Sequence, residues 1–424
     1  MLPSPQLLAA LLLFSWALAS AQVLPLPVVA PENVGLSPQR LQSLTRAYQQ
    51  EVDQGRLPGA VIAIARKGQV AYFEAIGYRD ASTREPMKRD ALFSIASMTK
   101  PMVSVAIMML HEEGRLLLSD PIGKHLPALA NMQLGVLKPG SPEGFERVAP
   151  PRQPTIQDLL RHTSGVASAS RGDSPMHKLW PASSSAAAFS FTGPELIAEM
   201  ARLPLAYAPG TVWDYSLSTD VLGLIVEALS GKSLGAYLDE RLWKPLGMVD
   251  TAFDLRQGDR SRYALALPKD PLTGQAQFVL HADPRKIKFP CGGGCALSTA
   301  PDYLRFAQML LDGGTFQGQR LLSRKTIEYM SSDHLGPAVR ARTTSPVLAE
   351  GYGFGLGFAV RGQNGIAAVS GSMGDYFWGG AYGTLFWVDP KEQMVVVYMA
   401  HATGALGAQH RAMIRNLVYQ ALVD

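Results

Sequence analysis

The sequence predicts an α/β fold of the α+β type, in which helices flank one antiparallel sheet and a mainly helical domain is inserted. Strand-like apolar runs occur near both ends of the chain, helical periodicity and capping motifs fill its middle, and no internal repeat is present. Strands at both ends imply that the termini build the sheet together. The expected domains are a discontinuous sheet domain, 30–118 with 283–424, and an inserted helical and loop domain, 119–282.

The apolar run at the N-terminus is typical of an export signal. It extends from Leu7 to Ala21 and ends in Ala19-Ser20-Ala21, a small-x-small cleavage pattern, before Gln22. The run is short for a bilayer-spanning helix, although no Lys or Arg precedes it. We therefore expect a signal peptide over residues 1–21, a secreted or periplasmic protein, and no stable membrane insertion after cleavage.

The composition is that of a globular protein large enough for about two domains. The 424 residues are 47% hydrophobic and 17% charged, with a net charge of +4 and no long basic run. We expect no nucleic-acid partner, because the densest basic cluster, 285–288, fits a solvated loop. The only two cysteines, Cys291 and Cys295, flank three glycines and leave open whether a disulfide forms. They are too few for a zinc site, and we expect neither metal nor cofactor.

The first elements are a helix, a strand pair and a second helix. Residues 37–55 place Leu41, Leu44, Tyr48 and Val52 on one helical face. Two strand-like runs follow, 58–64 and 70–78, joined by the turn 67–69. Pro101 must lie in the first turn of the next helix, so that helix begins near Ser97. It is apolar from Met102 to Leu110, as a buried helix is, and Gly114 suits its end.

The middle of the chain alternates helices with loops. Residues 130–155 show little periodicity, and 166–191 are expected to form a long surface loop beside a cleft. The Arg171-Gly172-Asp173 tripeptide in that loop fits a chance occurrence better than an integrin motif. Thr155 and Thr192 each open a capping box. The helices expected here and beyond are 156–161, 192–202, 217–229, 234–246 and 300–311, and the C-terminal strands are 355–360, 382–388 and 394–399.

Ser97 and Lys100 form the first candidate catalytic pair. Residues three apart share a helix face, with Cβ atoms roughly 5–6 Å apart, so the lysine can reach the serine hydroxyl. A serine needs a neighbour to take its proton before it becomes a good nucleophile. Its place at a helix N-terminus also favours a developing negative charge. A Ser-x-x-Lys sequence is common by chance, however, so this pair is not sufficient evidence.

Two further stretches make the pattern specific. One is Trp213-Asp214-Tyr215-Ser216-Leu217, with Asp220-Val221-Leu222-Gly223 after it, and the other runs from Gly374-Asp375-Tyr376-Phe377-Trp378-Gly379-Gly380-Ala381 to Thr384. With Ser97 and Lys100, they resemble the three motifs of the serine β-lactamase/penicillin-binding protein superfamily, and most of all the family VIII carboxylesterases. The resemblance covers nearly the whole mature chain, and implies the β-lactamase-like fold.

The resemblance also implies a role for each motif residue. Ser97 would be the acylated nucleophile, Lys100 would hold its proton or keep Tyr215 ionised, and Tyr215 would be the general base. Because an ammonium stabilises a neighbouring phenolate, lysine and tyrosine would share their protons as a coupled pair. The backbone N–H groups of Ser97 and Ala381 would bind the oxyanion. Trp378, Gly379 and Gly380 would lie on a strand beside the cleft, where glycines allow close approach of the substrate.

Two positions depart from the pattern of the β-lactamases and peptidases. Trp378 stands where those enzymes carry a lysine that binds a substrate carboxylate, and Leu217 stands where they usually carry an asparagine. Both changes favour uncharged esters over carboxylated β-lactams. The expected partner is a small-molecule ester, and the expected activity is hydrolysis of short-chain carboxylic esters. A β-lactamase or amide hydrolase, or a slowly deacylating penicillin-binding or sensing module, stays open as an alternative, and the oligomeric state is open too.

Three other residues invite a catalytic role. Ser233 lies in a G-x-S-x-G sequence, but a helix precedes it where a nucleophile elbow needs a strand. His162 lies in His162-Thr163-Ser164-Gly165, which the resemblance assigns to a structural turn. His401 follows a C-terminal strand. We expect a structural role for all three.

Overall fold

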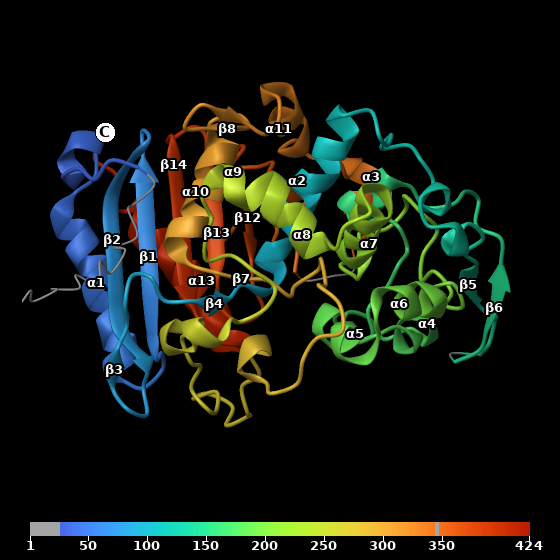
Figure 1. The fold of residues 1–424 in the computed structure, drawn as a ribbon, viewed down its shortest axis with the longest axis horizontal. Coiled ribbons are helices and arrows are strands. Elements are labelled where there is room, and N and C mark those ends of the chain that lie inside the picture. The colour runs from blue at the N-terminus through green and yellow to red at the C-terminus, as the bar shows by residue number, and fades with distance from the viewer. Residues whose placement is uncertain (1–25, 142, 344–346) are drawn as a thin grey trace, which may run out of the picture.

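The computed structural model describes residues 26–424 except 142 and 344–346. The predicted signal peptide, 1–21, lies outside these residues. Both ends of the described chain contribute to one antiparallel sheet, as predicted, and helices cover its two faces (Figure 1). The sheet has eight strands in the order β10-β11-β12-β13-β14-β1-β2-β3. Their bounds are β1 Gly59–Arg66, β2 Gln69–Asp80, β3 Glu85–Pro86, β10 Tyr352–Phe354, β11 Ala359–Arg361, β12 Tyr376–Gly379, β13 Leu385–Asp389 and β14 Met394–Ala400.

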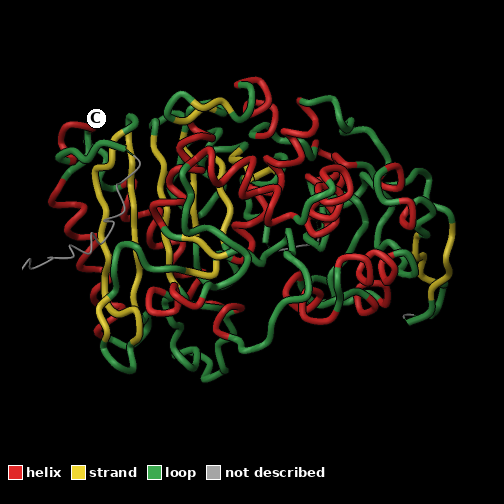
Figure 2. The backbone as a smooth tube through the Cα atoms, in the orientation of Figure 1, coloured by secondary structure: helices red, strands yellow, loops and turns green. Residues whose placement is uncertain are grey.

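Helices make up most of the regular structure outside the sheet (Figure 2). They are α1 Pro38–Asp53, α2 Thr99–Glu112, α3 Ile156–Leu160, α4 Pro175–Leu179, α5 Ser184–Ser190, α6 Gly193–Met200, α7 Ser218–Ser230, α8 Leu234–Leu238, α9 Lys244–Leu246, α10 Ala300–Leu311, α11 Arg324–Met330, α12 Gly336–Arg340 and α13 Gly404–Tyr419. A 3-10 turn, η2 (Ala96–Met98), precedes α2, and a π-turn, η5 (Asp239–Trp243), joins α8 to α9. Three small two-stranded sheets pair β4 (Phe93–Ser94) with β7 (Leu297–Ser298), β5 (Leu134–Leu137) with β6 (Phe145–Val148), and β8 (Thr315–Phe316) with β9 (Gln319–Arg320).

The central strand β1 separates two hydrophobic cores. It is buried along its whole length, because it is paired on both edges and covered on both faces. Ile62 and Ile64 point to the core shared with α1 and α13, whereas Val61 and Ala63 point to the core shared with α2, α7 and α10. This second core extends into the helical region, so α2 is buried at nearly every position. The helix that follows the candidate nucleophile is therefore held rigidly by this core.

Local signals predicted several elements closely. Lys67 and Gly68 both adopt the left-handed conformation in the turn between β1 and β2, as a tight hairpin requires. Gly114 follows α2 with a φ of 71°, and Thr155 and Thr192 form the predicted capping boxes. The division of the chain into the domains 30–118 with 283–424 and 119–282 stays a prediction.

The predicted surface loop at 166–191 is wrong. This segment contains α4 and α5, and it buries Val166, Met176, Trp180 and Ala187 in the large core. Ser183 caps α5 by accepting a hydrogen bond from Ala186 N–H, and an alanine-rich run then continues the helix. The polar composition therefore reflects capping and a cleft wall rather than solvent exposure.

Other elements lacked a local signal that we used. The β5–β6 hairpin lies in the segment expected to be irregular, and β10 and α13 were not predicted. Within the described residues no single helix is long and apolar enough to cross a membrane, and the two segments 218–230 and 234–246 pass such a test only as a pair bent by 77°.

Candidate active site

Ser97 lies in η2, at the entrance to α2. Ala96, directly before it, has a φ of 43°, which is uncommon for a residue with a side chain and is the kind of strain that functional sites keep. Pro101 occupies the first turn of α2, where its missing N–H removes no helical hydrogen bond. Thr99 fixes the turn from below, because its hydroxyl donates to the Ala96 carbonyl at 2.7 Å and accepts from Ala296 N–H at 3.1 Å.

The structure brings Lys100 and Tyr215 to Ser97. Lys100 is buried, and its Nζ lies 3.4 Å from Ser97 Oγ and 4.6 Å from the centroid of the Tyr215 ring. The same nitrogen donates to the Gly293 carbonyl. The three predicted catalytic residues therefore line one cleft, and Lys100 contacts the face of the phenol ring.

The Tyr215 hydroxyl is held by the sheet. It accepts a hydrogen bond of 3.2 Å from the indole N–H of Trp378 on β12. In the described part of the chain it makes no hydrogen bond to Ser97 or Lys100, so its contact with Lys100 is through the ring. The Trp378 ring lies 5.3 Å from the Tyr215 ring, which closes this side of the cleft with aromatic surface.

The predicted oxyanion donors lie on the same cleft. Ala381 follows β12, and both Ser97 and Ala381 line the cavity. Neither of their N–H groups donates to an acceptor among the described residues, whereas Gly380 N–H is used by the Thr384 carbonyl. A Cβ at Gly380 would collide with the Thr384 hydroxyl and the Ile95 carbonyl, so this turn can approach the nucleophile only as glycine.

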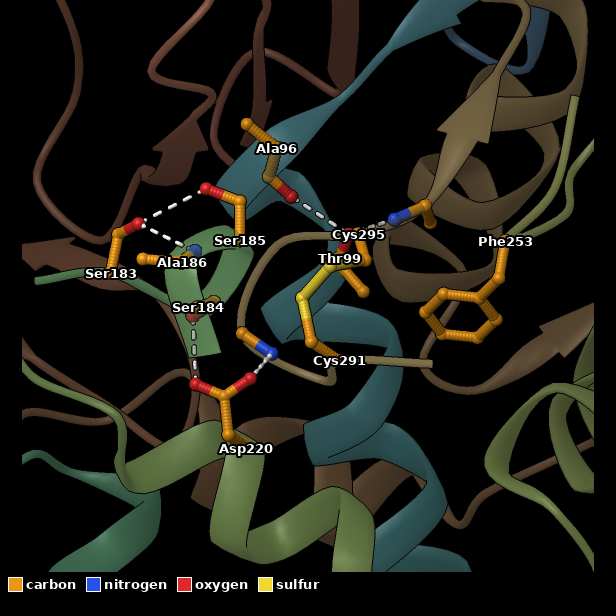
Figure 3. The surroundings of a disulfide bond; sticks show 12 residues. Ala96, Thr99, Ser183, Ser184, Ser185, Ala186, Asp220, Phe253, Cys291 and Cys295 are labelled. Atoms are coloured by element: carbon orange, nitrogen blue, oxygen red, sulfur yellow. Dashed lines mark hydrogen bonds between the residues drawn. A yellow bond between two sulfur atoms is a disulfide. The ribbon is translucent and has the colours of Figure 1, made fainter. Parts of the chain in front are cut away.

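No role was assigned from the sequence to the glycine loop 292–294, whose Gly293 carbonyl accepts a hydrogen bond from Lys100. Cys291 and Cys295 form a disulfide across it, which resolves the question left open by the sequence. Asp220 on α7 accepts from Gly293 N–H at 2.8 Å and from the Ser184 hydroxyl at 2.7 Å, as Figure 3 shows beneath the loop. A side chain on Gly293 would strike both partners of this bond network. The signal was present, since Asp220 stands five residues after Tyr215, but the contact is long-range.

Two buried groups, Asp220 and His162, interact electrostatically with Lys100. Burial raises the pKa of Asp220, and the nearby Lys100 charge opposes that rise. Burial, aided by Lys100, holds the pKa of His162 well below its usual value, so His162 is neutral. Its ring packs 4.7 Å from the Tyr215 ring, and its Nδ1 accepts from Ser216 N–H. His162 is a structural residue, as expected.

Ser233 and His401 also have structural roles. Ser233 caps α8 in the predicted interhelical turn, accepting a hydrogen bond from Ala236 N–H. His401 Nε2 accepts from Ser94 N–H at 3.1 Å, while Nδ1 lies 3.0 Å from the Ala264 carbonyl. Burial lowers the pKa of His401 to about 4, so it is neutral and tethers the chain just before Ser97.

The cleft has two lobes that share Ser97, Arg171, Tyr215 and Ala381. A polar lobe of about 90 Å³ is walled by serines from 168–170 and 183–185, and a wider lobe of about 550 Å³ is bordered by Trp378 and β12. A larger cavity, about 730 Å³, lies under α8 and α9 and contains none of the predicted site residues. No group of three or more potential metal ligands occurs within the described chain.

Comparison with known proteins agrees with this fold. Residues 44–420 match the family Beta-lactamase. Protein Rv1367c of Mycobacterium tuberculosis is 35% identical over 358 residues, 82% of this chain and 86% of its own. Esterase EstB of Burkholderia gladioli is 32% identical over 389 residues, 89% of this chain and 94% of its own.

A solved structure shares the architecture over nearly the same length. It is that of EstCE1, described as a hydrolase with promiscuous acyltransferase activity, with a TM-score of 0.72 and 27% identity over 90% of this chain and 99% of that one. The chain therefore belongs to the serine β-lactamase/penicillin-binding protein superfamily. EstB and EstCE1 are consistent with the resemblance to family VIII carboxylesterases.

Proposed function

We propose that this protein is a serine hydrolase that cleaves short-chain carboxylic esters through an acyl-enzyme on Ser97. The observation that carries the proposal is the approach of Lys100 Nζ to Ser97 Oγ, at 3.4 Å, beside the Tyr215 ring. The same cleft holds two backbone N–H groups, of Ser97 and Ala381, that have no acceptor among the described residues. The esterase names of EstB and EstCE1 support the same reaction class.

The reaction would proceed in two halves. Ser97 Oγ attacks the ester carbonyl while its proton passes to the Lys100/Tyr215 pair, and the carbonyl oxygen becomes an oxyanion held by Ser97 and Ala381 N–H groups. Collapse breaks the bond to the alcohol oxygen, which leaves with that proton. Water then attacks the acyl-enzyme with the same pair as base, releasing the acid and restoring Ser97. The hydrogen bond from Trp378 would orient the Tyr215 hydroxyl between these steps.

The site favours esters over β-lactams on the sheet side of the cleft. Trp378 is buried against Tyr215 and offers an indole N–H that is already bonded, so it presents no cation to a substrate. Leu217 lines the polar lobe without an amide. We also propose, on the sequence alone, that the protein is secreted or periplasmic, that its partner is a small-molecule ester, and that it does not bind nucleic acid.

The test is a 4-nitrophenyl butyrate assay with a panel of variants. Ser97→Ala should lose about a thousandfold or more in kcat, since the nucleophile is gone. Tyr215→Phe should lose about 10²–10⁴-fold, the usual range for a lost proton-transfer group. Ser233→Ala is the matched control and should keep its activity, because Ser233 only caps α8.

Two further readouts separate the alternatives. Intact-mass spectra of the wild type should show an acyl adduct that is absent from Ser97→Ala. A chromogenic cephalosporin hydrolysed faster than any ester would favour the β-lactamase alternative, and a stable adduct without turnover would favour the sensing module. Full esterase activity in Ser97→Ala would refute the proposal.

A further inference from the structure

Arg171 is a cation in the cleft that has no charge partner among the described residues. It lines both lobes, together with Ser97, Tyr215 and Ala381. Its guanidinium carbon lies 5.4 Å from the centroid of the Tyr215 ring. Its side chain is exposed and makes no hydrogen bond or ion pair with any other described residue, and its backbone N–H donates to Ser168 O.

Each of the other cations that line the cleft donates a hydrogen bond to the protein or forms an ion pair with it. Lys100 donates to the Gly293 carbonyl, Arg411 donates to the Gly380 carbonyl at 2.9 Å, and Arg415 pairs with Asp375. No aspartate or glutamate is found among the described residues that line either lobe. The described lining of the cleft is therefore cationic, and Arg171 is the cation in it whose side chain makes no hydrogen bond to another described residue, so all its donors are available to a ligand.

The backbone around Arg171 is anchored, so this cation is held near the reacting groups. The Ser168 and Ser170 hydroxyls both donate to the Ala182 carbonyl. Gly172 packs directly against the ring of His177, whose Nε2 lies 3.1 Å from a carboxylate oxygen of Asp214. Asp214 is adjacent in the chain to Tyr215, which ties the Arg171 segment to the candidate base.

We propose that Arg171 binds a carboxylate of the substrate, so that the preferred esters are acidic: half-esters of dicarboxylic acids or esters of hydroxy acids. A guanidinium offers a planar pair of donors that matches a carboxylate. This inference rests on the proposed esterase function and narrows its substrate class. It also changes the expectation of uncharged esters, which rested on Trp378 and Leu217, because a cation reaches the cleft from the wall opposite Trp378.

The experiment compares acid and neutral esters in matched pairs. On the acyl side, 4-nitrophenyl hemiglutarate is paired with 4-nitrophenyl valerate, and on the alcohol side the butyryl ester of 3-hydroxybenzoate is paired with phenyl butyrate. The wild type should favour the acid ester in at least one pair, and rising ionic strength should weaken that preference. Arg171→Gln should lower the acid-to-neutral ratio of kcat/KM about tenfold, the effect of losing one charge-assisted contact.

The ratio cancels any change that the substitution causes in the Tyr215 environment. Arg171→Lys should keep part of the preference, since it keeps the charge but loses the planar pair of guanidinium donors. Arg46→Gln is the matched control, because Arg46 is an exposed arginine on α1 that has no ion pair among the described residues. An unchanged ratio in Arg171→Gln for both pairs would overturn the inference while leaving the esterase proposal intact.

A binding measurement keeps the inference testable without turnover. Calorimetric titration of Ser97→Ala with 4-nitrophenyl hemiglutarate and with the valerate ester should show tighter binding of the acid ester, and the added Arg171→Gln substitution should remove the difference. The same titration with the two alcohol-side esters tests the second pair. Equal binding of acid and neutral esters in both pairs counts against Arg171 whether or not the enzyme hydrolyses them.

Discussion

The two walls of the cleft are built in different ways. The wall from β12 and its following turn presents backbone and aromatic surface: Trp378, Gly379, Gly380 and Ala381. The wall from the helical region presents hydroxyls and a cation from 168–171 and 183–185. On the sheet wall, the backbone at Gly380 lies so close to neighbouring atoms that no Cβ fits there. This close packing fixes the geometry of the wall. On the helical wall, exposed side-chain atoms of Arg171 project from an anchored backbone.

This difference separates the chemistry from the choice of substrate. The nucleophile, the oxyanion donors and the partner of the Tyr215 hydroxyl depend on the sheet wall and on η2, where a small displacement would misplace every group at once. The Arg171 segment can change its side chains without moving those groups. We therefore expect substitutions in the machinery to reduce turnover of all esters, and substitutions at Arg171 to change which ester is preferred.

Among the residues that support the catalytic groups, the largest effect is expected at Asp220, which supports Lys100 from the helical side. Asp220→Asn keeps the size of the side chain, but it removes a buried charge near Lys100 and leaves the amide facing either Gly293 N–H or the Ser184 hydroxyl. We expect kcat to fall about tenfold or more. Because the charges of Asp220 and Lys100 interact, removing the Asp220 charge should shift the acidic limb of the pH–rate profile.

A purely structural role for Asp220 would lower the thermal stability and leave the pH–rate profile in place. The control is Asp239→Asn. The carboxylate of Asp239 is exposed and pairs with Lys244 on the surface. That variant should match the wild type in both measurements.

A smaller effect is expected at Trp378, on the sheet wall. Trp378→Phe keeps an aromatic ring and removes only the N–H donor to the Tyr215 hydroxyl. The loss of one such bond, about 1 kcal/mol, should reduce kcat about fivefold for acid and neutral esters alike. Trp387→Phe on β13 is the matched control, because its indole N–H has no partner among the described residues. A change in ester preference with kcat preserved would contradict the comparison of the two walls.

The smallest effect on neutral-pH activity is expected at His401, which joins the end of β14 to the chain before Ser97. Its pKa of about 4 lies below the ordinary value of about 6.5, so the unfolded chain binds more protons between these values. Stability is therefore lost as pH falls from about 6.5 to about 4, by on the order of 3 kcal/mol. His401→Gln can keep both hydrogen bonds without titrating, and should flatten this part of the dependence of Tm on pH.

Thermal unfolding between pH 7 and pH 4 checks this expectation. His111→Gln, near the end of α2 and partly exposed, is the control and should keep the wild-type pH dependence. If His401→Gln destabilises the protein equally at every pH, the buried neutral imidazole is not the source of the acid sensitivity.

Short-range sequence patterns determined the helix starts, the helix caps and the candidate catalytic pair. The spacing of Ser97 and Lys100, the place of Pro101 in the first helical turn and the capping boxes at Thr155 and Thr192 all act within a few residues, so they could be interpreted without a structure. The strand-like apolar runs near both ends of the chain also indicated a sheet shared by the two ends.

Tertiary structure decided what the cleft contains. The helices of 166–191 form because distant apolar residues cover Trp180 and Met176, and the grip of Asp220 on Gly293 joins positions 73 residues apart. Arg171 lines the cleft only because the folded chain places its segment next to Tyr215. Such contacts leave no periodic trace in the sequence, since they depend on which surfaces meet after the helices and sheet have packed.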